Sequence, residues 1–471
     1  MAPRRDAGRR DPYPMDDMTP GSVTNDAAGS IPRGLVLLAL SLGVLVAQVD
    51  TSVVNLAMQP IGAALHASVA ALQWVLDAYN LVYAVLLLAG GAIADLYGRR
   101  RAFRIGVAVF AAASIAGATA PTIQLLIAAR AAAGIGAAMA VPASLAIIRV
   151  VWPEPVARRR ALGVWASCNG LAFVIGPTLG GLLVERFGWR SVFYLIVPFA
   201  LAAFWLAGAV VPESADPQGR RLDIPGQACG AVALGALVLA AISHAGGVGR
   251  WGSALGLAVV ALVLFVIVER RAGAAALVPP QLFRERGFLG AIVATSAMTF
   301  GIYGMIFLLP LVWQSSGFLA AARVGVALLP CSLVFFLVSP RSGHLAERFG
   351  ARRMIATGTG LIGCGLLVLS ASSAGRPLPL AELGLALTGI GMGLNTGPLM
   401  SVAVEAVTAA RSGTASSLIN VARMVGATLG VAVLGAGFAA LGGGTAGFRL
   451  AMLVGGGVQL CGAAIAWGAI A

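Results

Sequence analysis

Two acidic residues and one arginine lie inside segments that are otherwise apolar. Asp50 falls about six residues before the end of the first apolar run, Asp77 about four residues into the second, and Arg130 about seven residues into the fourth. If these runs are helices that cross a bilayer in alternating directions, a rise of about 1.5 Å per residue places all three residues within roughly 10 Å of one edge. An unpaired charge at that depth costs several kcal/mol, so the three residues should face a cavity or one another.

This arrangement could bind and release a proton. Loss of water disfavours the charged form of a carboxyl group, whereas a neighbouring arginine favours it. A carboxyl group balanced between these two effects can take up a proton in one conformation and lose it in another. We therefore predict that Asp50, Asp77 and Arg130 form a proton-coupling site. The alternatives are an inert Asp–Arg pair that only orients helices and, for Asp77 near the end of its run, simple solvation.

The other residue types exclude several kinds of chemistry. All 32 Lys+Arg residues are arginine, which excludes a Walker A lysine and a lysine Schiff base with pyridoxal phosphate. The three histidines have no metal-ligand spacing, and the five cysteines lie within apolar runs as small hydrophobic residues. No Gly-x-Ser-x-Gly nucleophile elbow with plausible partners occurs. We predict that the chain is not an enzyme and that it uses no metal or other cofactor.

The composition is that of an integral membrane protein. Of 471 residues, 59% are hydrophobic and 11% are charged, and the mean hydropathy is +0.91, whereas soluble domains carry about 25% charged residues. Apolar runs of the ~20 residues needed to cross a bilayer recur about fourteen times. The predicted fold is therefore all-α, with transmembrane helices at 34–56, 73–94, 103–120, 123–148, 161–184, 191–211, 224–244, 251–268, 288–313, 324–342, 354–371, 380–404, 413–438 and 448–470.

The arginines are distributed unequally between the two sets of loops. With the N-terminus inside, 24 lie on the inner side, six lie on the other side, and two, Arg130 and Arg423, lie within spans. The positive-inside rule then predicts a multi-pass protein of the cytoplasmic (inner) membrane with both termini in the cytoplasm. The net charge of +14 reflects this topology, so we predict no nucleic-acid partner. Residues 1–33 are polar and lack an apolar stretch, and they are predicted to be a disordered cytoplasmic leader.

A repeated loop motif divides the spans into two halves. The first copy follows the second span, and the second copy, 252 residues later, follows the tenth. Two six-helix halves, 34–211 and 288–470, thus flank an extra helix pair at 224–268. Parallel halves of this kind are a transporter architecture, with the substrate site between them at mid-membrane. The motif positions are Gly91, Asp95, Gly98, Arg99 and Arg100 in the first copy and Gly343, Glu347, Gly350, Arg352 and Arg353 in the second.

Loops of this composition can hold neighbouring helices together in one state and release them in another. Glycine permits a tight turn, and the acidic residue can pair with arginines or cap a helix. A short charged loop that only sets topology is the alternative, and the recurrence of the motif in the second half argues against it. We therefore predict two cytoplasmic gating loops.

These motifs resemble those of the major facilitator superfamily, and specifically of its fourteen-span drug:proton antiporter family. Gly91–Arg101 resembles the superfamily loop motif, with Leu96 in place of the usual basic residue. Arg130–Gly136 resembles the family's arginine motif, and Asp50–Ala57 resembles its first-span signature, with Gln59 at the place of the usual proline. The resemblance covers nearly the whole chain. Its most specific part is the antiporter motif of the fifth span, which comprises Gly170, Gly176, Pro177, Gly180 and Gly181.

The antiporter motif predicts a particular kind of helix surface. Small residues allow helix backbones to approach closely, and Pro177 permits a kink. Ordinary membrane packing explains isolated glycines, but the whole set favours a gating seam between the two halves.

The resemblance implies a proton-coupled secondary transporter that exports drugs, antibiotics or similar lipophilic small molecules. Its partners would be the substrate, protons and the lipid bilayer, and it would function as a monomer. Tyr303 on the ninth span and Arg423 in the middle of the thirteenth are candidates for the substrate cavity, with ordinary packing as the alternative for each. Other interpretations are a metabolite or amino-acid exporter on the same scaffold, a non-transporting membrane sensor and, less compatible with duplicated loops, a channel.

Overall fold

The computed structural model describes residues 32–215, 224–242, 248–272, 285–372, 378–405 and 412–470, and within these ranges the chain forms helices and no strands. Fourteen helical segments of these ranges are long and apolar enough to cross a membrane. This confirms the predicted all-α fold with fourteen spans. The predicted leader, apart from its last two residues, lies outside the described residues.

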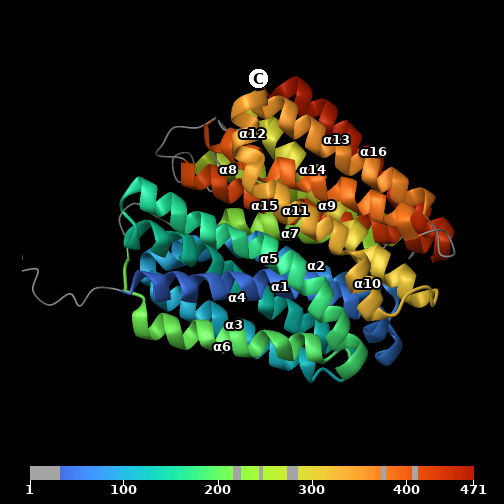
Figure 1. The fold of residues 1–471 in the computed structure, drawn as a ribbon, viewed down its shortest axis with the longest axis horizontal. Coiled ribbons are helices and arrows are strands. Elements are labelled where there is room, and N and C mark those ends of the chain that lie inside the picture. The colour runs from blue at the N-terminus through green and yellow to red at the C-terminus, as the bar shows by residue number, and fades with distance from the viewer. Residues whose placement is uncertain are drawn as a thin grey trace, which may run out of the picture.

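The first six spans form one bundle, drawn from blue to green in the lower part of Figure 1. Within it α4 packs against α2 and α3, and α1 packs against α5 and α6. Ser68 and Thr122 begin two of these helices, because each side-chain oxygen accepts a hydrogen bond from a backbone N–H of the first turn. The helices are α1 (Arg33–Ala64), α2 (Val69–Tyr97), α3 (Arg99–Ala118), α4 (Ile123–Val151), α5 (Pro155–Phe187) and α6 (Ser191–Val210).

The last six spans form the second bundle, drawn from yellow to red in Figure 1. The tenth span, expected at 324–342, extends over Ala321–Phe349 and is interrupted twice. Pro330 and Pro340 lie in the first turns after the interruptions, where a missing N–H breaks helical hydrogen bonding. The elements are α9 (Arg286–Ser315), α10 (Ala321–Ala327), α11 (Leu329–Val338), the 3-10 helix η4 (Ser339–Arg341), α12 (Ser342–Phe349), α13 (Ala351–Ala371), α14 (Leu378–Glu405), α15 (Ser412–Ala440) and α16 (Gly444–Ala469).

The turns between helices lie at the two ends of the bundle. We refer to the end that holds the start of α1 and the α2–α3 and α12–α13 turns as the arginine-rich end. The end that holds the α1–α2, α5–α6 and α9–α10 connections is the opposite end. In Figure 1 the arginine-rich end lies to the left.

The extra helix pair covers a seam between the two halves. α7 (Ile224–Ile242) packs against α2 of the first half and α15 of the second, and α8 (Val248–Ala272) packs against α7. Val238 and Ile242 of α7 form a small apolar cluster with Ala432 of α15 and Trp74 of α2. α8 leaves most of its apolar side chains exposed, as expected of a helix that faces lipid.

Candidate functional site

A buried ion pair lies in the middle of the first half. Nη1 of Arg130 donates to both carboxylate oxygens of Asp50, at 2.8 and 2.6 Å, and Nε donates to the carbonyl oxygen of Val75 at 3.1 Å. Asp50 is 0% exposed and Arg130 is 2% exposed. The guanidinium carbon also lies 4.7 Å from the centre of the Tyr79 ring. The structure therefore brings together two of the three charged residues that the sequence places in one layer.

The glycines of the arginine motif bring α4 into position for this pair. Gly134 packs against the backbone of Tyr79 on α2, and Gly136 packs against Gly106 and Phe110 on α3. A Cβ atom at either glycine would overlap the neighbouring backbone. Because α4 approaches both helices so closely, Arg130 lies within hydrogen-bonding distance of Asp50 and of the α2 backbone.

Asp77 has a different environment. Its side chain on α2 is 0% exposed, and neither carboxyl oxygen has a hydrogen-bond partner among the described residues. Simple solvation near the end of a span is therefore not its situation. The depth of Asp77 in its own helix does not determine its burial, because α15 and α7 both cover this part of α2.

A cavity of about 20 Å³, enough for about one water molecule, lies between the two halves, beside the ion pair. Its polar wall is formed by α1, which contributes side-chain hydroxyl and amide groups from the turns around Asp50. The other walls are aromatic and aliphatic side chains of α5 and α9. The lining residues are Gln48, Thr51, Ser52, Asn55, Phe173, Tyr303 and Ile306.

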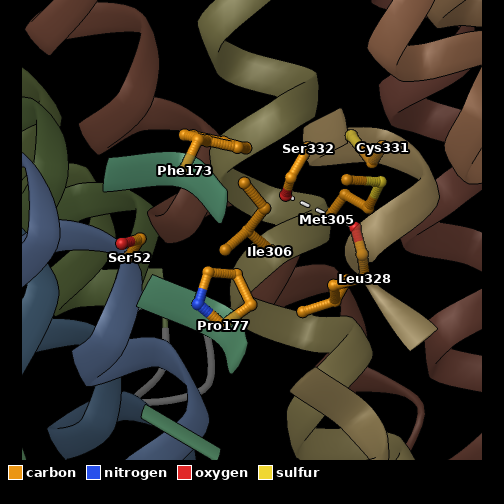
Figure 2. Close-up of a pocket in the computed structure, with 8 residues that line it drawn as sticks. All are labelled: Ser52, Phe173, Pro177, Met305, Ile306, Leu328, Cys331 and Ser332. Carbon is orange, nitrogen blue, oxygen red and sulfur yellow. Dashed lines mark hydrogen bonds between the residues drawn. The ribbon is translucent and has the colours of Figure 1, made fainter. Parts of the chain in front are cut away.

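A second small cavity adjoins the first and shares Ser52, Phe173 and Ile306 with it. Figure 2 shows these side chains together with Met305 of α9 and Pro177 of α5. No charged side chain lines either cavity within the part of the chain that the structure describes. The remaining lining residues are Leu328, Cys331 and Ser332, from the break between α10 and α11 and the start of α11.

The antiporter motif packs against both halves. Gly176 contacts the side chain of Ser52, and Gly180 contacts Val53, so this face of α5 lies against α1. Gly181 contacts the backbone of Ala321 on α10, in the second half. Gly170 lies against the Phe336 ring of α11, and Pro177 lines the cavity. The motif thus places α5 in close contact with the other half along the predicted seam.

Hydrogen bonds join the halves near the opposite end. Gln73 of α2 donates to the carbonyl oxygens of Val431 and Ala432 on α15, at 2.9 Å each. Gln314 of α9 donates to the carbonyl oxygen of Leu56 on α1 at 3.0 Å. The carboxylate of Glu185 on α5 accepts from the backbone N–H of Ala322 at 3.0 Å. No role was predicted for these residues from the sequence, although Gln73, like Asp50, is a polar residue inside an apolar run.

The first of the two predicted gating loops forms hydrogen bonds with the segment that follows α6. Gly98 turns the chain between α2 and α3 with φ +109°, a conformation that favours glycine. Asp95 forms an ion pair with Arg99 at 2.8 Å. Glu213, which follows α6, accepts hydrogen bonds from the backbone N–H groups of Arg100 and Arg101 at 3.0 and 3.3 Å. A carboxylate there stabilises the N-terminus of α3.

Glu213 is the residue in contact with this loop that the sequence did not reveal. Nη1 of Arg100 also donates to the carbonyl oxygen of Val211, at 3.2 Å. The only sequence signal was an acidic residue shortly after the sixth span. Gly91 lies deeper in α2, where its nearest neighbour is Pro142 of α4.

The second gating loop has the same turn with fewer contacts. Gly350 has φ +87°, and Gly343 has open space around it. Glu347 is exposed and forms no ion pair or hydrogen bond with the described residues. The guanidinium carbon of Arg352 lies 4.4 Å from the Trp467 ring, and Arg353 is exposed. The repeat therefore specifies the backbone turn, while the contacts differ between the halves.

Two helical halves around a central cavity, with matching loops and two extra helices, define a membrane transporter of the two-bundle class. The chain matches the family profile described as Major Facilitator Superfamily over residues 40–431. It belongs to that superfamily, and it is a multi-pass membrane transporter rather than an enzyme.

Several relatives are named for drug resistance. The chain is 38% identical to the multidrug resistance protein Stp of Mycobacterium tuberculosis over 411 residues, which are 86% of this chain and 76% of the relative. It is 31% identical to the methylenomycin A resistance protein of Streptomyces coelicolor, over 86% of each chain. It is also 31% identical to the multidrug efflux pump LfrA of Mycolicibacterium smegmatis, over 86% of this chain and 81% of the relative.

The fold is similar to that of solved transporter structures. A crystal structure of a POT family transporter in complex with 5-aminolevulinic acid aligns with a TM-score of 0.69 and 15% identity, over 92% of this chain and 95% of that one. At this identity the likeness concerns the fold alone.

Proposed function

We propose that this protein is a proton-coupled exporter of drug-like small molecules. The proposal places it in the cytoplasmic membrane as a monomer with both termini in the cytoplasm. The observation that carries it is the buried Asp50–Arg130 ion pair, which lies beside the cavity between the halves. The relatives named for multidrug resistance, antibiotic resistance and drug efflux support a drug as the exported substrate.

The position of the ion pair on α1 suggests how a proton and a substrate affect each other. The ionised carboxylate of Asp50 holds α1 against α4 through Arg130. Protonation removes this charge attraction and allows α1 to shift. Thr51 and Ser52 lie on the same turn of α1 and line the cavity. A ligand that binds one position of α1 better must therefore change the affinity for the proton, and the proton changes the affinity for the ligand equally.

Asp77 is proposed as a second proton site. A buried carboxylate without a partner is costly, so its ionisation requires water or a cation to reach it. The seam between α2 and α15 closes over this part of α2 through Gln73. Ionisation of Asp77 is thereby linked to the opening of this seam.

Reconstitution tests the proposal. The purified full-length chain is placed in proteoliposomes, a proton gradient is imposed, and uptake or efflux of labelled antibiotics is measured against their own gradients. We expect transport to follow the proton gradient and to stop when a protonophore collapses it. Uphill transport driven by a sodium gradient alone, or no uphill transport of any compound in the panel, would contradict the proposal.

Reporter fusions test the orientation. Because the arginine-rich end carries most of the basic residues, fusions after Arg104, Arg160 or Arg353 are expected to report the cytoplasm. A fusion at Gly247, which lies between the two extra helices and outside the described residues, is expected to report the outer side. A cytoplasmic signal at Gly247 would show that the extra pair does not cross the membrane twice.

The two gating loops should respond unequally to loss of their acidic residues. Asp95→Asn removes a charge from a buried ion pair and should lower transport about tenfold, since a charge-assisted hydrogen bond is worth about 1.5–3 kcal/mol. Glu347→Gln removes an exposed carboxylate without an ion pair to the described residues and should leave transport within about twofold. Initial rates at equal amounts of folded protein measure both. Equal, full activity of the two variants would leave the loops with a topological role only.

A further inference from the structure

The arginine in the middle of the thirteenth span has no counter-ion among the residues that the structure describes. Arg423 on α15 is half-buried, and its Nη1 makes one long hydrogen bond, of 3.4 Å, to the side-chain oxygen of Asn420. Its Nε is buried and has no hydrogen-bond partner. The ion pairs among the described residues belong to Arg99, Arg100, Arg101 and Arg130, and none includes Arg423. An unpaired guanidinium inside a membrane protein is costly, so a partner is expected in at least one state of the protein.

The helices around Arg423 place it at the contact between the two halves, although it is not among the residues that line the cavity. α15 packs against α2 of the first half and α9 of the second, and Ser296 of α9 donates to the carbonyl oxygen of Ala422, next to Arg423, at 3.2 Å. The charge of Arg423 also acts on the phenol groups of Tyr83 on α2 and Tyr303 on α9. Tyr303 lines the cavity together with Thr51 and Asn55 of α1. The two tyrosines come from different halves, so Arg423 lies at the junction where the halves meet around the cavity.

The walls of the cavity contain no acidic side chain that could pair with this arginine. Asp50 lies on the same helix as the polar wall, but both of its oxygens are held by Arg130 inside the first half. Asp77 is buried on α2, and its carboxyl oxygens accept no hydrogen bond from the described residues. Asp50 and Arg130 neutralise each other beside the cavity, so the guanidinium of Arg423 adds a positive charge that, in a water-poor space, attracts anions and repels organic cations.

We propose that the cavity, when it enlarges as the halves separate, selects small molecules that combine an apolar, preferably aromatic, body with a carboxylate, which Arg423 binds. The planar guanidinium presents paired donors that match a carboxylate, and Tyr303, which lines the cavity, provides a hydroxyl donor. Phe173 and Met305 offer aromatic and thioether surface for the apolar body. That such molecules are the exported cargo rests on the proposed function; their binding through Arg423 does not.

Three probes that share one ring system test the proposal: 1-naphthoate, 1-naphthamide and 1-naphthylmethylammonium. The full chain is placed in phosphatidylcholine nanodiscs, so that no anionic lipid competes, and each probe is titrated while the unfolding temperature is followed. We expect the largest stabilisation from naphthoate, a smaller one from naphthamide and none from the ammonium. In Arg423→Gln the apparent Kd for naphthoate should rise about tenfold or more, because the charge-assisted hydrogen bonds are lost.

Two further variants keep the test decisive. Arg423→Lys keeps the charge but loses the paired donors, and its Kd should rise by less than that of Arg423→Gln. Arg449→Gln removes an exposed arginine of α16 and should leave the Kd unchanged. No stabilisation by naphthoate, equal stabilisation by the three probes, or an unchanged naphthoate Kd in Arg423→Gln overturns the proposal. If Arg423→Gln does not fold, an equal Kd in Arg423→Lys and Arg449→Gln overturns it.

A second measurement distinguishes failure of the Arg423 binding site from failure of the proposed export. Uphill transport is measured in proteoliposomes with the same probes. Binding of naphthoate through Arg423 without uphill transport of any compound would retain the site and overturn the proposed function. Uphill transport that persists unchanged for the ammonium and the carboxylate would retain export and overturn the selectivity.

Discussion

Replacing Asp50 by asparagine is expected to abolish efflux against a concentration gradient while substrate still binds. Asparagine keeps the shape of the side chain and accepts a hydrogen bond from Arg130, but it cannot exchange a proton near neutral pH. The cavity walls at Thr51 and Ser52 remain in place. Efflux with and without an imposed proton gradient, together with equilibrium binding of the same compound, measures the two effects separately.

Loss of folding must be distinguished from loss of coupling in this variant. Asp50→Asn leaves the buried charge of Arg130 without a counter-ion, which costs about 3–5 kcal/mol. The double variant Asp50→Asn/Arg130→Gln removes both charges, so it should recover folded protein without recovering uphill efflux. Arg130→Ala alone leaves Asp50 unpaired and should damage both properties.

A conservative variant provides the matched control for coupling. Asp50→Glu keeps a carboxyl group and moves it by one methylene, so part of the uphill efflux should remain with a changed dependence on pH. An Asp50→Asn protein that concentrates substrate as well as the parent would place the coupling site elsewhere, and Asp77 would be the next residue to replace.

The proximity of Asp50 to Arg130 could be predicted, because a charged side chain inside an apolar span is tolerated in few environments. Two such charges of opposite sign at one depth must therefore pair with each other or face a cavity. The structure shows the pair, and the carbonyl oxygen of Val75 satisfies a third donor of Arg130.

The environment of Asp77 could not be predicted in the same way. Its depth in a single helix indicated access to solvent, but its burial depends on α15 and on α7, whose positions follow from packing over the whole molecule. The same holds for Glu213, whose carboxylate reaches the N-terminus of α3 only because α6 ends beside it. Local spacing specifies turns and caps, whereas these contacts join segments more than one hundred residues apart in the chain.

The two predicted gating loops show that the motif determines the backbone turn but not the side-chain contacts. Gly98 and Gly350 both adopt positive φ, as the repeated glycine indicates. The acidic residue is buried in an ion pair in the first copy and exposed in the second. The motif therefore predicts the backbone of both turns, and the side-chain partners depend on the helices that each half brings nearby.

The close packing of α5 against α10 provides the second large expected effect. Gly181 lies against the backbone of Ala321 and Ala322 in the other half, and a Cβ atom there would lie 3.0 Å from the Cα of Ala322 and closer to the carbonyl oxygen of Ala321. Backbone atoms cannot move aside as a flexible side chain does. The Glu185–Ala322 hydrogen bond lies at the same contact, so separation of the two helices would remove it as well.

Gly181→Ala is therefore expected to disfavour the arrangement in which the halves meet at the opposite end. Overpacking costs about 1–3 kcal/mol, which shifts the equilibrium away from this arrangement by about 5- to 150-fold. Transport should fall accordingly, and a cysteine introduced at Thr51 in the cavity should react faster with an impermeant thiol reagent added from the opposite end, relative to the chain without that cysteine. Gly163→Ala, on the same helix but with open space around it, is the control and should change neither measurement. Two results together would contradict this expectation: Gly181→Ala transports as fast as Gly163→Ala, and the cysteine of Thr51→Cys reacts with the thiol reagent equally slowly in both. The α5–α10 contact would then not have to form and break during transport.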